Sequence, residues 1–214
     1  MKVIGVDLSG PRNTADTYLV VLNEQGTELH LIDNVNGADD LQIFHTITGL
    51  GSNESIIIGI DAPLSYNPGG GDRTSDADLR HVVHEKGGGI GVLPPTMIRM
   101  VYLTLRGIVL TRMLETLKPD FDLRIVEVHP GACMLLRGAP AKVVAAFKHD
   151  KSARFQLLQW LGKQGLKGIS QTEDVADHYV AACAAALGAW HWSLGRSAWF
   201  SSAKQPDHPY DFAC

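Results

Sequence analysis

The segment IIIGIDAPL (residues 56–64) ends an apolar run on a carboxylate, and this feature governs how the rest of the chain is interpreted. Residues 56–60 are almost all isoleucine, which is typical of a strand buried on both faces of a sheet. Asp61 follows at once, and Pro63 ends the strand because proline cannot donate to a strand ladder. Such an acid is either a local turn former or part of a site.

Two other predicted strands end in the same way. Residues 2–8 (KVIGVDL) form an apolar run that closes on Asp7, and residues 123–130 (LRIVEVHP) carry Glu127 shortly before a proline. A single acid at a strand end is usually a turn former or a helix cap. Three strands that end on acids make this local explanation weaker for the set.

The other elements predict an α/β domain with a mixed five-stranded sheet flanked by helices. Strands over residues 16–23 and 27–35 are joined by a turn in which Gly26 can take positive φ. Further helices are expected near residues 39–48, 75–85, 96–117, 150–164 and 173–194. This order predicts an antiparallel trio of strands and two strands added parallel to the first through helical crossovers.

A Gly- and Pro-rich insertion after the fourth strand is expected over about residues 62–98. Long loops above a strand end are often functional. We predict one domain over residues 1–200 and an irregular, polar tail over residues 201–214.

The predicted topology brings two of the acids together. If the strands that begin at residues 2 and 55 are parallel neighbours, Asp7 and Asp61 lie side by side, with backbones about 4.8 Å apart. Ligands of open α/β sheets gather at the carboxyl ends of strands. Neighbouring carboxylates repel each other unless a cation joins them, and oxygen ligands without cysteine favour Mg²⁺ or Mn²⁺.

A fourth acid is available at the start of the last predicted helix, DVADHYVAACAAAL. Asp174 and Asp177 are three residues apart and share one helix face. Four convergent acids can hold two divalent ions roughly 3.5–4 Å apart, one activating water and one stabilising a leaving oxygen. His178 adjoins Asp177 but is expected to point elsewhere.

Composition places the protein among ordinary globular domains. The 214 residues are 45% hydrophobic and 20% charged, with a net charge of −4, so bulk charge does not favour a polyanion binder. Three widely spaced cysteines indicate reduced thiols rather than a disulfide framework or a structural zinc site. The apolar tracts are too short for a signal-peptide core or a bilayer span, so we expect a cytoplasmic protein with no membrane partner.

An ordered set of motifs resembles a known family. These motifs are GVDLS, IGIDAPL, GDR-x-x-D-x-x-LR (residues 71–80), VEVHP and an Asp-led, Ala-rich final helix. Together they resemble the uncharacterised family of predicted RNase H-like nucleases, DUF429. The resemblance implies an RNase H/RuvC-like fold with strand order 3-2-1-4-5 and a two-metal site of Asp7, Asp61, Glu127 and Asp177, with Asp174 as a possible substitute for Asp177.

The function expected from this resemblance is hydrolysis of phosphodiester bonds in nucleic acid with two Mg²⁺ or Mn²⁺ ions. Arg73 is a candidate phosphate clamp. Arg80 belongs to the same motif, although with Asp76 it also fits a surface ion pair. His129 shares a strand face with Glu127 and is either a substrate-contacting group or a capped core histidine.

Two other functions stay open. A non-catalytic metal- or nucleic-acid-binding module of the same fold would keep the acids without cleaving. An actin-like phosphotransferase is less favoured, because the sequence has no second phosphate loop and is short for that class. The stretch 139–170, with six Lys or Arg against one acid, either follows a phosphate backbone or is a solvated face.

Overall fold

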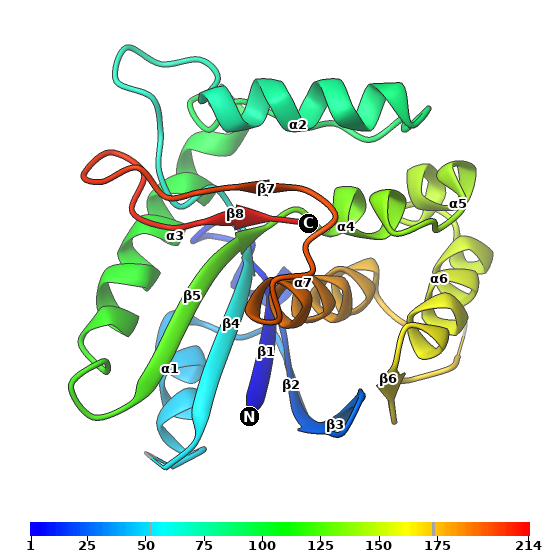
Figure 1. Cartoon of the computed structure of the whole chain (residues 1–214), viewed down its shortest axis with the longest axis horizontal. Helices are drawn as coiled ribbons and strands as arrows, with labels where there is room; N and C mark the ends of the chain where they lie inside the picture. The colour runs from blue at the N-terminus through cyan, green and yellow to red at the C-terminus, as the bar shows by residue number, and fades with distance from the viewer. Residues whose placement is uncertain (52, 173) are drawn as a thin grey trace.

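The computed structural model describes residues 1–51, 53–172 and 174–214. Within these residues the chain forms one mixed sheet of eight strands together with seven α-helices (Figure 1). The strands are β1 (Lys2–Asp7), β2 (Tyr18–Gln25), β3 (Glu28–Asn36), β4 (Ser55–Asp61), β5 (Asp122–Val128), β6 (Leu166–Lys167), β7 (Phe200–Ser201) and β8 (Phe212–Ala213). The helices are α1 (Asp40–Thr48), α2 (Thr74–Glu85), α3 (Ile98–Glu115), α4 (Pro130–Leu136), α5 (Ala141–Ala146), α6 (Lys151–Lys163) and α7 (Asp177–Ser193), and a 3₁₀ turn spans Thr14–Asp16.

The strands lie in the order β6-β3-β2-β1-β4-β5-β8-β7. β2 is antiparallel to both β1 and β3, whereas β4 runs parallel to β1 and β5 runs parallel to β4. The α/β class and the mixed sheet are therefore confirmed. The sheet has eight strands rather than the five expected from the sequence.

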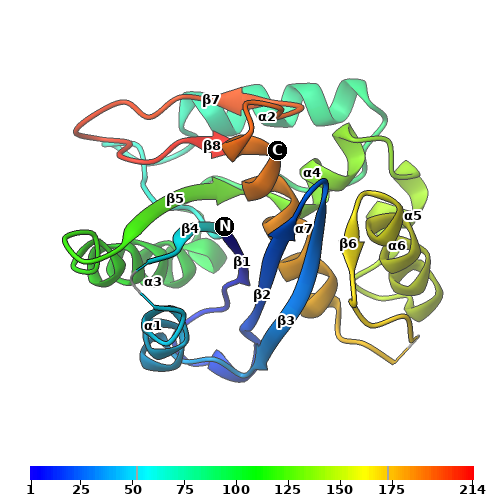
Figure 2. The same ribbon diagram turned by 60° about the horizontal axis from the view of Figure 1, so that its bottom comes forward.

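The three additional strands are short and lie at the edges (Figure 2). β6 pairs with β3, while β8 pairs with β5 and is itself paired with β7. The segment 201–214, expected to be irregular, thus contains β8 and the end of β7. Two-residue strands have no hydrophobic period of their own, so a sequence pattern cannot reveal them.

Most helices lie where the sequence places them, with ends shifted by a few residues. The predicted 173–194 helix is α7, and its predicted first residue lies outside the described residues. The short helices α4 and α5 were not expected. α4 begins directly after β5 at Pro130, where proline suits a first helical position and His129 supplies the cap.

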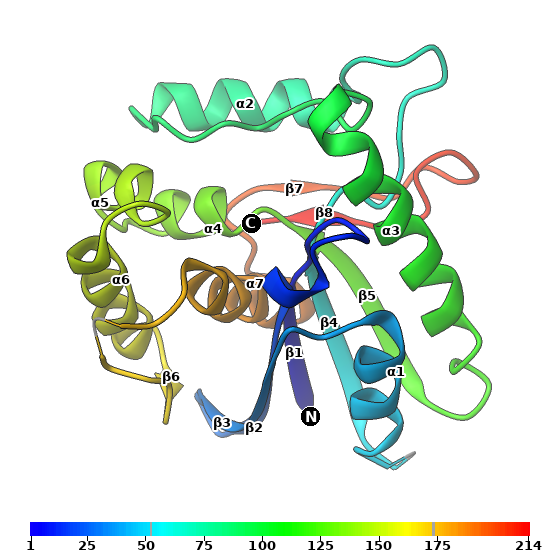
Figure 3. The same cartoon turned by 180° about the vertical axis from the view of Figure 1, so that it is seen from behind.

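Helix α7 packs on one face of the sheet, and α1 and α3 cover the other face (Figure 3). Two glycines make the packing of α7 against the sheet possible. A Cβ added to Gly5 would lie 1.9 Å from the carbonyl oxygen of Ala182, and one added to Gly59 would lie 2.5 Å from that of Ala185. The Ala-rich helix therefore approaches the backbones of β1 and β4 more closely than side chains would permit.

The carboxyl ends of β1, β4 and β5 meet at one edge of the sheet, and α2 lies beyond that edge (Figure 1). The insertion that contains α2 connects β4 to α3 and therefore extends over this edge. None of the helices in the described residues is both long and apolar enough to cross a membrane. The sheet edge beneath the insertion is where a ligand is expected in an open α/β fold.

Candidate active site

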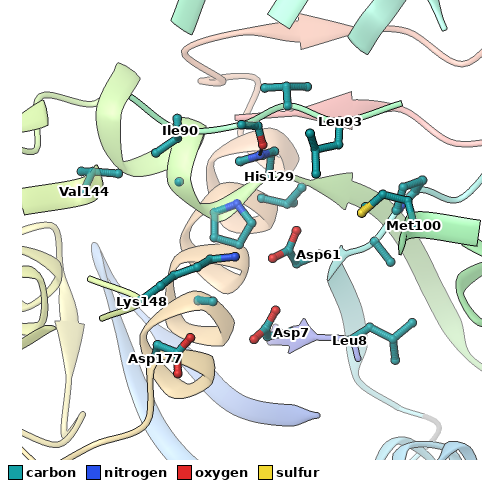
Figure 4. A pocket seen from close by; sticks show the side chains of 18 of the residues that line it. Asp7, Leu8, Asp61, Ile90, Leu93, Met100, His129, Val144, Lys148 and Asp177 are labelled. Carbon is teal, nitrogen blue, oxygen red and sulfur yellow. Dashed lines mark hydrogen bonds between the residues drawn. The ribbon is translucent and has the colours of Figure 1, made fainter. Parts of the chain in front are cut away.

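A cavity of about 530 Å³ lies at the carboxyl ends of β1, β4 and β5 (Figure 4). Several separate segments form its walls: the strand ends, the segment 89–93, the start of α3, residues 144–149 and the first turn of α7. The acids in its lining are Asp7, Asp61, Asp76, Glu127 and Asp177. The cavity therefore collects all four residues that the sequence identified as candidate catalytic acids.

Asp7 and Asp61 are register partners on the parallel strands β1 and β4. Figure 4 shows both carboxylates in the same part of the cavity. Burial raises the pKa of Asp61 well above its usual 3.8, and the negative charge of Asp7 and a hydrogen bond with Asp7 raise it further. The two side chains thus form a carboxylate pair that is stabilised by a shared proton or by a cation.

Asp7 also binds His178, so the expectation from the sequence that this histidine points elsewhere is wrong. His178 Nδ1 lies 2.6 Å from Asp7 Oδ2. The hydrogen bond with Asp7 raises the pKa of His178 above its ordinary value, although partial burial opposes the effect. His178 is in the first turn of α7, and the Asp7 to which it binds is 171 residues away in the chain, so no local pattern announces the contact.

Glu127 lies in the same lining, but Arg73 holds it inside the protein. Arg73 Nη1 donates to Glu127 Oε2 at 2.7 Å, and Nη2 donates to Oε1. The backbone N–H of Leu64 donates to Oε2 at 2.9 Å. Because the Glu127 side chain is only 6% exposed and both oxygens have donors, it is less accessible to a ligand than Asp7 or Asp61.

The two arginines predicted to contact substrate have internal partners. Arg73 uses Nε and Nη2 to hold the carboxylate of Asp76, at 3.0 and 2.7 Å, besides its bonds to Glu127. Arg80 pairs with Asp72 at 2.6 and 2.8 Å and donates from Nε to the carbonyl of Val92. Arg73 therefore fixes the insertion to β5 through Glu127, whereas Arg80 links two parts of the insertion to each other.

His129 caps α4 and contacts the insertion. Its Nδ1 accepts from the backbone N–H of Ala132 at 3.2 Å, so Nε2 carries the proton and donates to the carbonyl of Gly91 at 3.1 Å. Burial lowers the pKa of His129, which favours this neutral ring. The ring belongs to the cavity wall, and both of its nitrogens serve the fold, as in the capped histidine considered from the sequence.

The two candidate acids of the last helix lie in different environments. Asp177 is the first residue of α7 and lines the cavity. Asp174 has a side chain that is 85% exposed and pairs with Lys151 at 2.7 Å. Lys151 lowers the pKa of Asp174 through this hydrogen bond and its charge. Asp177 is thus the acid that the fold brings to the cavity.

Lys148 is a second cavity residue to which the sequence assigned no individual role. It follows α5 in the turn before α6, and Figure 4 shows its amino group extending toward Asp61. The charge of Lys148 lowers the pKa of Asp61, but burial raises that pKa by more. The same charge also lowers the pKa of His129, and there burial acts in the same direction.

The lining offers limited support for a metal. Among residues 1–51, 53–172 and 174–214, no three or more His, Cys, Asp or Glu are grouped closely enough to hold an ion. The Asp7–Asp61 pair supplies two carboxylates. Two carboxylates suffice where Mg²⁺ completes its coordination with water and substrate phosphate.

Comparison with known proteins gives a family without an assigned activity. Residues 5–206 match the family model described as "Protein of unknown function (DUF429)". Neither a curated protein nor a solved structure matches the chain significantly.

Proposed function

Because this chain belongs to the DUF429 family, whose description assigns no activity, we propose a function from its site: divalent-metal-dependent hydrolysis of phosphodiester bonds in nucleic acid. The sequence motifs that resemble those of predicted RNase H-like nucleases support the same proposed activity. In this proposal the strands β1, β4 and β5 and helix α7 are the site-bearing elements of an RNase H-like fold.

One observation carries the proposal: Asp7 and Asp61 are in register at the carboxyl ends of adjacent parallel strands, within one cavity. The protein keeps two acids together although burial and mutual repulsion raise the pKa of Asp61. A divalent cation would relieve this repulsion, and the pair has the oxygen donors that Mg²⁺ or Mn²⁺ prefers. The residues present fit one such ion better than two, because Glu127 is held by Arg73.

The chain's own residues have separate roles in this mechanism. Asp7 and Asp61 would hold the ion, which when bound supplies positive charge against the charge that develops on a phosphodiester. His178 orients Asp7 through the 2.6 Å contact, as outer-shell partners orient metal ligands. Asp177 contributes a further carboxylate to the cavity wall, where it can orient water or substrate hydroxyl groups.

A second candidate function is a binding module that uses the same cavity without cleavage. The Arg73–Glu127 ion pair favours such a binding module, because Arg73 binds the carboxylate that a two-ion hydrolase would use as its third acidic ligand. The absence of a three-residue metal group among the described residues points the same way. Cleavage, rather than binding, therefore has to be measured.

The deciding experiment incubates the purified protein with Mn²⁺ and a panel of end-labelled single-stranded, duplex and hybrid nucleic acids. Wild type is expected to cleave at least one of them, and Asp61→Asn is expected to lose cleavage while keeping its circular dichroism spectrum. Asp120→Asn removes an acid from an exposed position at the end of the α3–β5 connection and is the matched control. Equal cleavage by wild type and Asp61→Asn would identify a contaminant and refute the hydrolase.

A further inference from the structure

We propose that the cavity admits one unpaired nucleotide of a single-stranded nucleic acid, with Lys148 as the phosphate anchor and the segment 90–93 with Met100 as an apolar wall for the base. This inference rests on the proposed function in taking nucleic acid as the ligand. It goes further by naming the form of the substrate and the residues that select it.

The size of the site favours a single nucleotide. The cavity measures about 530 Å³, which is within the roughly 300–1,000 Å³ range of small-molecule sites. The segment 89–93 and residues 144–149 line the same cavity as Asp7 and Asp61, and they adjoin each other, since a Cβ added to Gly89 would lie 3.6 Å from that of Ala145. An unpaired nucleotide can enter a site of this size directly, whereas a nucleotide of a duplex first has to leave its stack and its partner, at a cost in free energy.

The apolar wall is held in place before any ligand binds. Ile90, Leu93 and Met100 line the cavity, and Figure 4 shows Leu93 and Met100 on the side of Asp61 and Ile90 farther from the carboxylates, near Val144. The carbonyl of Gly91 accepts from His129, and the carbonyl of Val92 accepts from Arg80, so two distant side chains fix this segment. Apolar side chains of this kind can pack against the face of an unpaired base that has entered a pocket.

Lys148 supplies the positive charge. It is exposed, it forms no ion pair with any other described residue, and its amino group extends into the cavity toward Asp61. Arg99 enters the lining from the start of α3 and is likewise exposed. A lysine beside the two carboxylates that would hold the ion can bind the phosphate group of the substrate through its charge.

The rest of the basic stretch lies outside the cavity lining. Of its six Lys and Arg residues, only Lys148 lines the cavity. Lys151 pairs with Asp174, and Lys167 pairs with Glu28. Duplex binders gain affinity by neutralising many phosphates at once, whereas Lys148 is the one residue of this stretch in the lining that the structure describes.

Binding is tested apart from cleavage, in EDTA and low salt. Fluorescence anisotropy is measured with a labelled eight-nucleotide single strand and with the same strand in a duplex. We expect the single strand to bind at least about tenfold more tightly. Lys148→Gln should weaken single-strand binding by about tenfold and lower the slope of log K against log salt by about 0.7. Lys142→Gln removes an exposed lysine outside the cavity lining and should change neither quantity.

Each outcome separates this inference from the proposed function. Equal or tighter duplex binding, no binding to either probe, or unchanged affinity in Lys148→Gln overturns the inference, even if Asp61-dependent cleavage is found. Lys148-dependent binding of the single strand without any cleavage supports the inference and refutes the hydrolase. Asp61-dependent cleavage of duplex alone supports the hydrolase and overturns the single-strand substrate.

Discussion

Arg73 and Glu127 are 54 residues apart in the chain and form a buried ion pair with two hydrogen bonds. Their side chains are 4% and 6% exposed. The pair joins the insertion at the start of α2 to the end of β5, and it occupies the acid that the sequence proposed as a third metal ligand. Its role in the fold can be separated from a role at the metal.

Glu127→Gln is expected to lower the free energy of unfolding while leaving Mn²⁺ binding close to that of wild type. Breaking a buried ion pair by removing one partner costs about 3–5 kcal/mol when the other charge is left unpaired, and a smaller loss is expected here because Arg73 keeps the carboxylate of Asp76. Urea unfolding measures the first quantity, and calorimetric titration with Mn²⁺ at low temperature measures the second. If Glu127→Gln folds but no longer binds Mn²⁺, Glu127 is a ligand of the metal ion.

Asp61→Asn is expected to be more stable than wild type near neutral pH when no divalent ion is present. The pKa of Asp61 is raised in the folded state, so the folded protein retains a proton that the unfolded chain releases above its ordinary 3.8. The stability of wild type therefore falls as pH rises from about 4 through the folded-state pKa, and the variant lacks this loss. The melting temperature should differ by roughly 2–4 °C for each kcal/mol gained.

Adding Mn²⁺ should make wild type more stable than Asp61→Asn, because the ion binds and stabilises wild type and not the variant. Thermal scans between pH 4 and 8, with EDTA or with Mn²⁺, give both comparisons. Parallel pH profiles for the two proteins in EDTA would mean that Asp61 titrates normally in the folded state.

Asp177→Asn and Asp174→Asn are expected to differ in any nucleolytic activity. Asp177 lines the cavity, whereas Asp174 is exposed and bound to Lys151. We expect about a 10–100-fold loss of cleavage in Asp177→Asn, as for groups next to metal ligands, and a change of less than about twofold in Asp174→Asn. Initial rates with Mn²⁺ decide this, and the reverse ranking would assign the role to Asp174.

Gly5→Ala is expected to destabilise the protein strongly. The new Cβ would lie 1.9 Å from the carbonyl oxygen of Ala182, which belongs to the backbone of α7 and cannot rotate away. Overpacking of a core typically costs about 1–3 kcal/mol, and more is expected here because the helix itself has to move. Gly10→Ala is the control, since its added Cβ meets no atom within 4 Å. Similar urea midpoints for both variants would contradict the close contact.

Phe212→Ala is expected to cost about 3–5 kcal/mol of unfolding free energy. Phe212 is 5% exposed in β8, and the Arg73 guanidinium lies 5.4 Å from its ring centre, so the C-terminal strand covers the Arg73–Glu127 pair. Phe200→Ala, in β7, removes a ring that is 49% exposed and should stay within about 0.5 kcal/mol of wild type. Equal losses would show that the two-stranded edge acts as one unit.

Much of the fold follows from local patterns. The runs at residues 2–7 and 55–61 are apolar enough to predict central strands even without knowing which strands lie beside them, and both runs end on acids. Helix α7 is Ala-rich along its length, which predicts close packing on the sheet. The short strands β6 and β8 could not be predicted, because backbone pairing across the sheet edge, rather than a repeating pattern of side chains, creates them.

The sequence by itself showed acids at or near the ends of three predicted strands and predicted a parallel pairing of two of them, because hydrophobic runs and their connections restrict how strands pair. Only the tertiary structure decided the state of each acid. In the folded protein Glu127 pairs with Arg73, and Asp7 binds His178. Asp174 lies on the surface, where it pairs with Lys151. These choices depend on side chains up to 171 residues apart meeting at one edge of the sheet, and no local pattern encodes such meetings.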